Sequence, residues 1–336
     1  MPFNSIGDLA SSLILSQSNM LAKRNLQKFS TELVTGVTSN IKSVLQNDMS
    51  RQVQWQRSLA SNSVLSKTLS EALTQTQSKR LVINSIENNT ASFANQITTS
   101  LASNSSSTLE SLSKNALNTL DQTLSQLNSE VAGRSLFSGS STDTMAIASS
   151  EVLLQSVKAY VAPSITPSGI TQKVREWMDD RNSGFESVAY FGSDDDPSPI
   201  RISEDRQITE ASKANHPAIK KVIESLFLAT ISSDENLGLA TAERATLLSE
   251  ASTGLRDAGT QLIQLEAGIG YIEGELQKAK TTVSSEIATT EQIRADVLGV
   301  DEFEIASRLQ STELQLEKIY TVTARASRMS LLEYLR

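Results

Sequence analysis

The chain has 336 residues, with 30 basic and 38 acidic side chains, no cysteine and a single histidine. Without thiols it can form no disulfide framework, thiolate zinc site, iron–sulfur cluster or cysteine nucleophile, and one histidine excludes metal motifs that need two. The net charge of −8 argues against a nucleic-acid binder, which needs a concentrated basic face. We therefore expect a protein that is not an enzyme and has no cofactor, no metal site and no nucleic-acid partner.

The N-terminal sequence does not resemble a targeting signal. The first residues carry no cationic segment ahead of an apolar run, so neither a secretory signal peptide nor a membrane span is predicted. Taken alone, this predicts a cytoplasmic protein with no membrane partner.

The prolines divide the chain into three zones. Only Pro2 lies in residues 1–140 and none lies in residues 218–336, so the remaining prolines fall in the middle. Because proline interrupts helices, the outer zones are free to form long ones. In the first zone we expect a weak amphipathic helix to about residue 33, a break at residues 35–36, and helical sequence from about 44 to 100 and from about 107 to 131.

The strongest periodicity lies in the last third. Apolar residues follow alternating steps of three and four over five heptads, which predicts a coiled-coil helix over about 239–297. At about 1.5 Å per residue this helix would approach 90 Å, so an elongated rod is predicted. The predicted rod coiled-coil seam contains Leu255, Leu262, Leu265, Ile269, Ile272 and Leu276.

Five glycines interrupt this predicted helix, at positions 254, 259, 268, 270 and 274. Each costs about 1 kcal/mol relative to alanine in a helix interior. Two interpretations stay open: a close approach of a neighbouring helix, or a place where the helix bends or changes its twist.

Both ends of the chain carry amphipathic helices with little apolar area. The last one begins after Asp301, a predicted N-cap. Such helices need partners, so we expect the ends to pair with each other or with neighbouring molecules. The predicted assembly interface consists of Ile6, Leu9, Leu13, Met20, Ile305, Leu309, Leu316 and Ile319.

Residues 141–215 are predicted to form a β-rich surface insert. β-branched runs such as 186–191 are bounded there by glycine, proline and aspartate. The segment holds 12 acidic and 7 basic residues, so it carries −5 of the net charge and is expected to be solvated. The aspartates at 194–196 are interpreted as a solvated turn, because no further ligands complete a calcium loop. His216, directly before Pro217, is interpreted as a neighbour of a helix cap.

Two motifs stand out near the helical segments: residues 133–144, GRSLFSGSSTDT, and the C-terminal stretches 301–309 and 330–336. The first is similar to the turn that closes the first helical segment in the flagellin family, and the C-terminal stretches are similar to that family's C-terminal helix. Residues 37–48 depart from the family and lack the version usual in filament subunits. The resemblance is therefore greater to the branch whose members join the flagellar hook to the filament.

The resemblance implies a mainly α, flagellin-like rod with a β-rich insert. The expected parts, in chain order, are an N-terminal assembly helix (1–43), the first half of a helical rod domain (44–140), the surface insert (141–215), the second half of the rod domain (216–300) and a C-terminal assembly helix (301–336). The C-terminal assembly helix is expected to pair with the N-terminal one.

The resemblance also implies a function and a location. It implies a structural adapter that self-associates in a ring, contacts a hook-side junction protein and flagellin, and has an export chaperone. Export through a type III channel without a cleaved signal peptide replaces the cytoplasmic prediction with an extracellular one. A filament subunit, and a secreted coiled-coil effector or adhesin, remain the alternatives.

Overall fold

A computed structural model of the chain describes residues 6–102, 105–162 and 166–334, without the side chains of residues 6–9, 11, 326, 327 and 329–334. The described part is mainly helical and contains long helices, which confirms the predicted fold class. Its helices are α1 (Ile6–Thr35), α2 (Ile41–Val44), α3 (Ser50–Leu101), α4 (Ser106–Leu127), α5 (Ser150–Val161), α6 (Pro167–Asp179), α7 (Pro217–Ile231), α8 (Thr241–Leu298) and α9 (Glu302–Tyr334). A π-helical turn, η1 (Phe185–Ala189), and a 3₁₀ turn, η2 (Glu235–Leu237), complete the helical elements. The strands are β1 (Glu130–Val131), β2 (Arg134–Ser135), β3 (Ile200–Arg201) and β4 (Gln207–Ile208), which form two antiparallel hairpins.

The chain divides into two compact units. The terminal unit contains Met1–Ser63 and Ser284–Arg336, and the core unit contains Val64–Val283. Both boundaries lie inside the long helices α3 and α8, whereas the predicted ranges divide the helical segments near the loops at residues 43 and 300.

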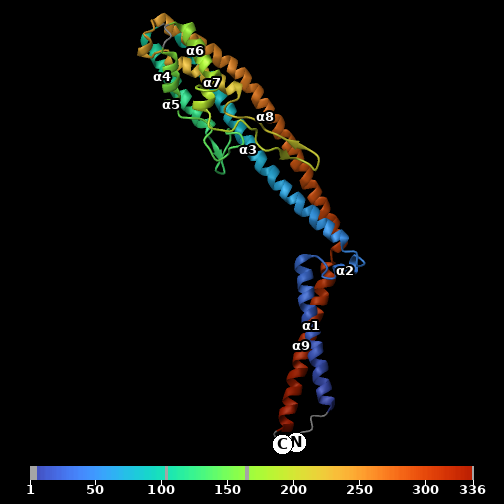
Figure 1. Cartoon of the computed structure of the whole chain (residues 1–336). Coiled ribbons are helices and arrows are strands. Elements are labelled where there is room, and N and C mark those ends of the chain that lie inside the picture. Colours follow the sequence, from blue (N-terminus) through green and yellow to red (C-terminus); the bar gives the residue numbers. More distant parts are fainter. Residues whose placement is uncertain (1–5, 103–104, 163–165, 335–336) are drawn as a thin grey trace. The chain divides into compact units, whose positions relative to one another are not determined.

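In the terminal unit, α1 and α9 lie side by side and run antiparallel (Figure 1). The end of α1 is joined to the start of α9 by a backbone hydrogen bond from Val300 N to Gly36 O at 3.1 Å. The two helices thus pair within one chain, as one of the two open expectations stated.

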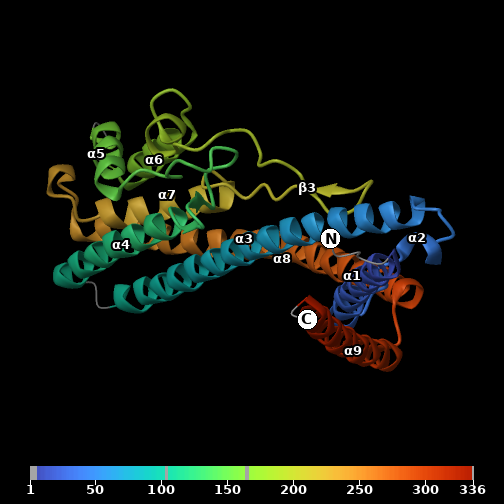
Figure 2. The same cartoon turned by 90° about the horizontal axis from the view of Figure 1, so that it is seen from below.

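In the core unit, α3 and α8 form an antiparallel pair along which the other helices pack (Figures 1 and 2). Polar contacts fix the register of this pair: Gln77 Nε2 donates to Glu273 Oε1 at 3.1 Å, and Arg256 Nη2 donates to Thr98 Oγ1 at 2.9 Å. Helix α4 packs on α7, and α7 in turn contacts α5 and α6.

The prediction of a β-rich, solvated insert at residues 141–215 is wrong. The segment contains α5, α6 and η1, and its only strands among the described residues are the two residues each of β3 and β4. Its apolar side chains share one core with α7 and α8: Leu153, Val157, Ile170 and Val174 are fully buried there. Steps of four residues along α5 and α6 are helical spacing, and Pro167 starts α6 at a position where proline is tolerated.

Trp177 is the largest fully buried side chain of this core. Its ring meets Phe227 edge-on at 5.7 Å between centroids and Phe185 at 6.3 Å. The indole Nε1–H donates to Ser156 Oγ at 3.1 Å, so the polar atom of the ring has a partner. Trp177 is therefore a packing residue of this core.

His216 is the N-cap of α7 itself rather than a neighbour of the cap. Its Nδ1 accepts a hydrogen bond from Ala218 N at 3.2 Å, and Pro217 follows at the first helical position. Burial lowers the pKa of His216 below its ordinary value of 6.5. The cap also requires a neutral Nδ1, because a protonated nitrogen cannot accept.

This cap predicts a pH-dependent stability of the core unit. Since the folded pKa is depressed, the unfolded chain binds a proton below pH 6.5 that the folded chain does not, so the unfolding free energy falls as pH drops from about 7 toward 5. The slope stays below about 1.4 kcal/mol per pH unit, the limit for one proton. His216→Asn, which keeps a good N-cap, is expected to remove this slope. Urea unfolding followed by Trp177 fluorescence in a Trp55→Phe background measures it, and an unchanged slope in His216→Asn would contradict the assignment.

Candidate assembly interface

The α9 residues of the predicted assembly interface are buried or half-buried within the single chain. Ile305, Leu316 and Ile319 are buried, with exposed fractions of 6, 7 and 8%, and Leu309 is half-buried. Leu316 and Ile319 form a small apolar cluster with α1. These side chains are therefore already covered within the chain.

The α1 side of the same cluster was not predicted. Ala22 is 2% exposed at its centre, and Leu15 and Leu26 pack against it. Phe29 and Leu33 continue this line with steps of three and four residues, and both are half-buried. That spacing is present in the sequence and could have identified the face.

The residues that the sequence did select on α1 lie on another face. Leu13 and Met20 are 61 and 59% exposed, and Ile14 and Leu21 beside them are exposed to a similar degree. The side chains of Ile6 and Leu9, the remaining two predicted residues of α1, lie outside the described part of the structure. Helix α1 thus has one apolar face covered by α9 and a second that the chain itself leaves uncovered.

A backbone clasp closes the end of the terminal pair. Val37 and Gly299 form an antiparallel bridge, with Thr38 N donating to Leu298 O at 2.9 Å. Gly36 makes this turn possible, because its φ of +65° lies in the left-handed region that glycine adopts freely. Asp301 then caps α9, accepting from the backbone N–H groups of residues 303 and 304, as predicted.

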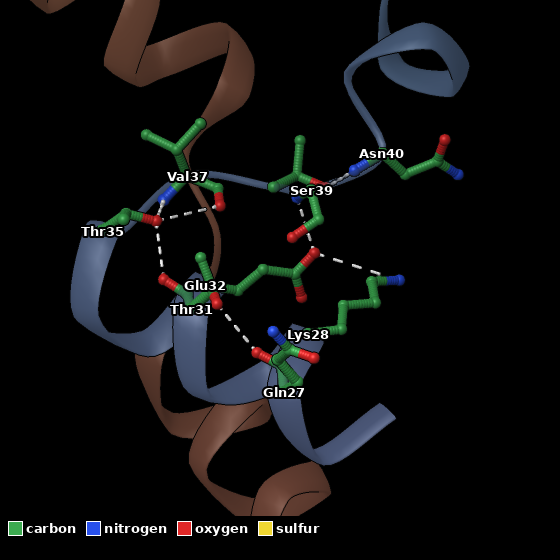
Figure 3. Close-up of polar contacts among 9 residues, drawn as sticks. Gln27, Lys28, Thr31, Glu32, Thr35, Val37, Ser39 and Asn40 are labelled. Atoms are coloured by element: carbon green, nitrogen blue, oxygen red, sulfur yellow. Dashed lines mark hydrogen bonds and ion pairs between the residues drawn. The ribbon is translucent and has the colours of Figure 1, made fainter. Parts of the chain in front are cut away.

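Glu32 holds the clasp from the side of α1. Its side chain is 3% exposed, and its Oε1 accepts a hydrogen bond from Ser39 N at 2.7 Å (Figure 3). Lys28 Nζ lies 3.9 Å from the same oxygen, so a cation accompanies the buried carboxylate. The sequence analysis did not identify Glu32, since no spacing rule marks a single carboxylate that meets a backbone N–H seven residues on.

Glu32→Ala is expected to loosen the clasp without unfolding the core unit. It removes the charged acceptor of the part-buried hydrogen bond from Ser39 N, and a hydrogen bond to a charged group contributes about 1.5–3 kcal/mol. Hydrogen exchange of peptides covering residues 36–40 should accelerate by roughly 5- to 100-fold. Glu32→Gln keeps an acceptor oxygen and serves as the control; equal exchange in both variants would show that the contact does not hold the segment.

The rod seam of α8 runs along the α3–α8 pair. Leu255, Leu262, Ile269 and Leu276 are at most 1% exposed, while Leu265 and Ile272 are half-buried. The fully buried positions follow one another every seven residues, as in one line of a coiled-coil seam.

The core unit also contains a polar groove. An open groove of about 600 Å³ between α6, α7 and α8 contains charged side chains that are paired with each other: Glu224 Oε1 accepts from Arg175 Nε at 3.1 Å and from Lys221 Nζ at 2.8 Å. Among the described residues no group of three histidines, aspartates or glutamates is placed to hold a metal ion. Nor is any helix in the described ranges long and apolar enough to cross a membrane.

Comparisons with known proteins place one part of this chain. Residues 253–335 match the family model of the bacterial flagellin C-terminal helical region, and this range covers most of α8 and all of α9. Curated protein sequences give no significant match. A solved structure described as a candidate flagellar hook-associated protein from Vibrio parahaemolyticus is similar at 13% identity, over 76% of this chain and 95% of that one. The TM-score of that match is 0.39.

Proposed function

We propose that this protein is a structural component of the bacterial flagellum, most like hook-associated protein three, and that it joins hook to filament. The observation that carries the proposal is the match of residues 253–335 to the C-terminal helical region of flagellins. The same segment supplies α9, and its partner α1 keeps a second apolar face uncovered.

The uncovered face of α1 supports self-association in a ring. Leu13, Ile14, Met20 and Leu21 would each gain free energy on burial, at about 25 cal/mol per Å² of apolar area. The terminal unit also contains 12 basic and 12 acidic residues, so the whole net charge of −8 belongs to the core unit. Terminal units can therefore pack together without net charge repulsion. The proposed partners of the ring are a hook-side junction protein and flagellin.

Export in an unfolded state fits this role. We propose passage through the flagellar type III channel to an extracellular position, with the help of a chaperone. The absence of cysteine means that no disulfide has to be broken before the chain unfolds.

Deletion of the encoding sequence tests the proposed function. The expected result is a strain that keeps hooks without filaments and releases flagellin as monomer into the medium, because the filament has nothing to attach to. Normal attached filaments in that strain would contradict the proposal.

A filament subunit is the second candidate, because the matching family model is that of flagellin itself. The purified chain separates the two candidates: a filament subunit should self-polymerise into long filaments, whereas an adapter should stay monomeric. The third candidate, a secreted effector or adhesin, depended on a separable acidic insert, and residues 141–215 share the core of α7 and α8 instead.

A further inference from the structure

The glycines of α8 have no packing role at four of their five positions. A Cβ at Gly254 would lie 2.3 Å from Ser225 Oγ, so glycine allows α7 to approach α8 there. At Gly259, Gly268, Gly270 and Gly274 a Cβ would meet nothing within 4 Å. Close helix approach therefore explains Gly254 alone, and the other four positions could hold alanine in a more stable helix.

None of these four glycines occupies the seam. The seam residues on both sides of them, such as Leu262, Ile269 and Leu276, stay fully buried. Polar contacts also hold the pair together along this stretch: Asn84 Nδ2 lies 3.4 Å from Glu266 Oε2, and Arg80 Nε lies 2.9 Å from Glu273 Oε2. Gly268 is exposed and Gly270 and Gly274 are half-buried, whereas Gly259 is buried. The last three glycines thus weaken the less buried part of α8 while its seam residues remain packed.

Glycine in a helix interior has two physical effects. It widens the range of backbone angles that each residue can adopt, and it leaves the neighbouring backbone hydrogen bonds open to water. When a helix bends, the backbone hydrogen bonds on its solvent side lengthen. Glycines outside the seam lie near these bonds, so they make such a bend easier.

We infer that residues 259–274 of α8, the glycine segment, form a compliant section of the α3–α8 pair, which bends or changes its twist while its apolar seam stays closed. The inference concerns the core unit alone and does not depend on the flagellar role.

Spin labels can measure this compliance in the full-length chain. Because the chain has no cysteine, Thr253→Cys and Thr281→Cys, both at exposed positions of α8, give two unique label sites. They flank the glycine segment at about 42 Å along an ideal helix, a distance suited to pulsed dipolar spectroscopy. We expect a broad distance distribution, which narrows when Gly268, Gly270 and Gly274 are all replaced by alanine.

Hydrogen exchange provides the local measurement. Peptides covering residues 262–278 should exchange on the order of 100-fold more slowly in the triple alanine variant, because each glycine lowers helix stability by a factor of about five. Ala267→Gly, at an exposed position within the segment, should widen the distance distribution and accelerate exchange by about fivefold.

A matched control separates compliance from general stabilisation. Thr246→Ala with Ser249→Ala raises the helix propensity of α8 at exposed positions outside the segment, and should leave the label distribution unchanged. Equal widths in the parent chain and the triple alanine variant would overturn the inference, even if exchange slowed. So would the same narrowing in the control variant.

Discussion

A chain in which Leu13 and Met20 are both replaced by aspartate is expected to fold normally but to leave the hook without a filament. Both side chains are about three-fifths exposed, so the change should alter the unfolding free energy by no more than about 0.5 kcal/mol. In an assembled ring the same positions would bury charge in an apolar contact, which costs several kcal/mol per subunit. Complementation of the deletion strain, followed by electron microscopy, measures the outcome.

Two further variants make this prediction specific. Leu13→Met with Met20→Leu keeps the face apolar and should restore attached filaments. Leu316→Asp places the same charge on the covered side of the terminal pair, where Leu316 is 7% exposed. It should accelerate hydrogen exchange in α1 and α9 of the isolated chain, which the double aspartate variant on α1 should not do. Attached filaments in that double variant would show that this face of α1 is not an assembly surface.

Replacing Lys79 with methionine is expected to cost the core unit about 3–5 kcal/mol, the usual effect of breaking a buried ion pair. Lys79 is 7% exposed and pairs with Glu210, which is 6% exposed. Its Nζ also donates to Ser212 O at 3.2 Å and lies 5.8 Å from the centroid of Phe137. The pair thus ties three distant segments together, and its loss leaves a carboxylate without its cation.

The double variant Lys79→Met with Glu210→Met tests the origin of that loss. Because no buried charge is left unpaired, most of the stability should return. Denaturation followed by Trp177 fluorescence, in the Trp55→Phe background, reports on the core unit alone, since Trp55 belongs to the terminal unit. A double variant as unstable as Lys79→Met would mean that the packing of the Lys79 side chain, rather than its charge, stabilises the contact between these segments.

The long helices were the most predictable part of the fold. The sequence predicts a helix over about 239–297, and α8 spans Thr241–Leu298, because five uninterrupted heptads exclude most other structures. The end of α1 near residue 35 and the cap at Asp301 were also predictable, because glycine at a helix end and aspartate at a helix start act through local geometry.

The middle of the chain shows where local patterns fail. Prolines and β-branched residues suggested strands, but α5 and α6 are short helices that gain their stability from a shared core with α7. Tertiary packing of this kind overrides the weak preference of a short segment.

In the candidate interface, the apolar residues of α1 could be found from the sequence, but not which of them face α9. Helix α1 carries two apolar lines, one through Leu13 and Met20 and one through Leu15, Ala22 and Leu26. Periodicity finds either line but does not say which one meets α9, because that depends on the partner's shape. The clasp at Glu32 and Ser39 was not predictable, since it depends on a turn that brings a carboxylate to a backbone N–H.

The position of this chain in the flagellum tests the proposed role most directly. Glu204 and Asp205 are both exposed in the turn between β3 and β4. An epitope inserted between them should leave both units folded and should itself be accessible to antibody. Immunogold electron microscopy of a motile strain that carries this insertion is expected to show one band of gold at the boundary between hook and filament. Gold distributed along the filament, or flagella without gold, would contradict the proposal that this protein is the adapter between them.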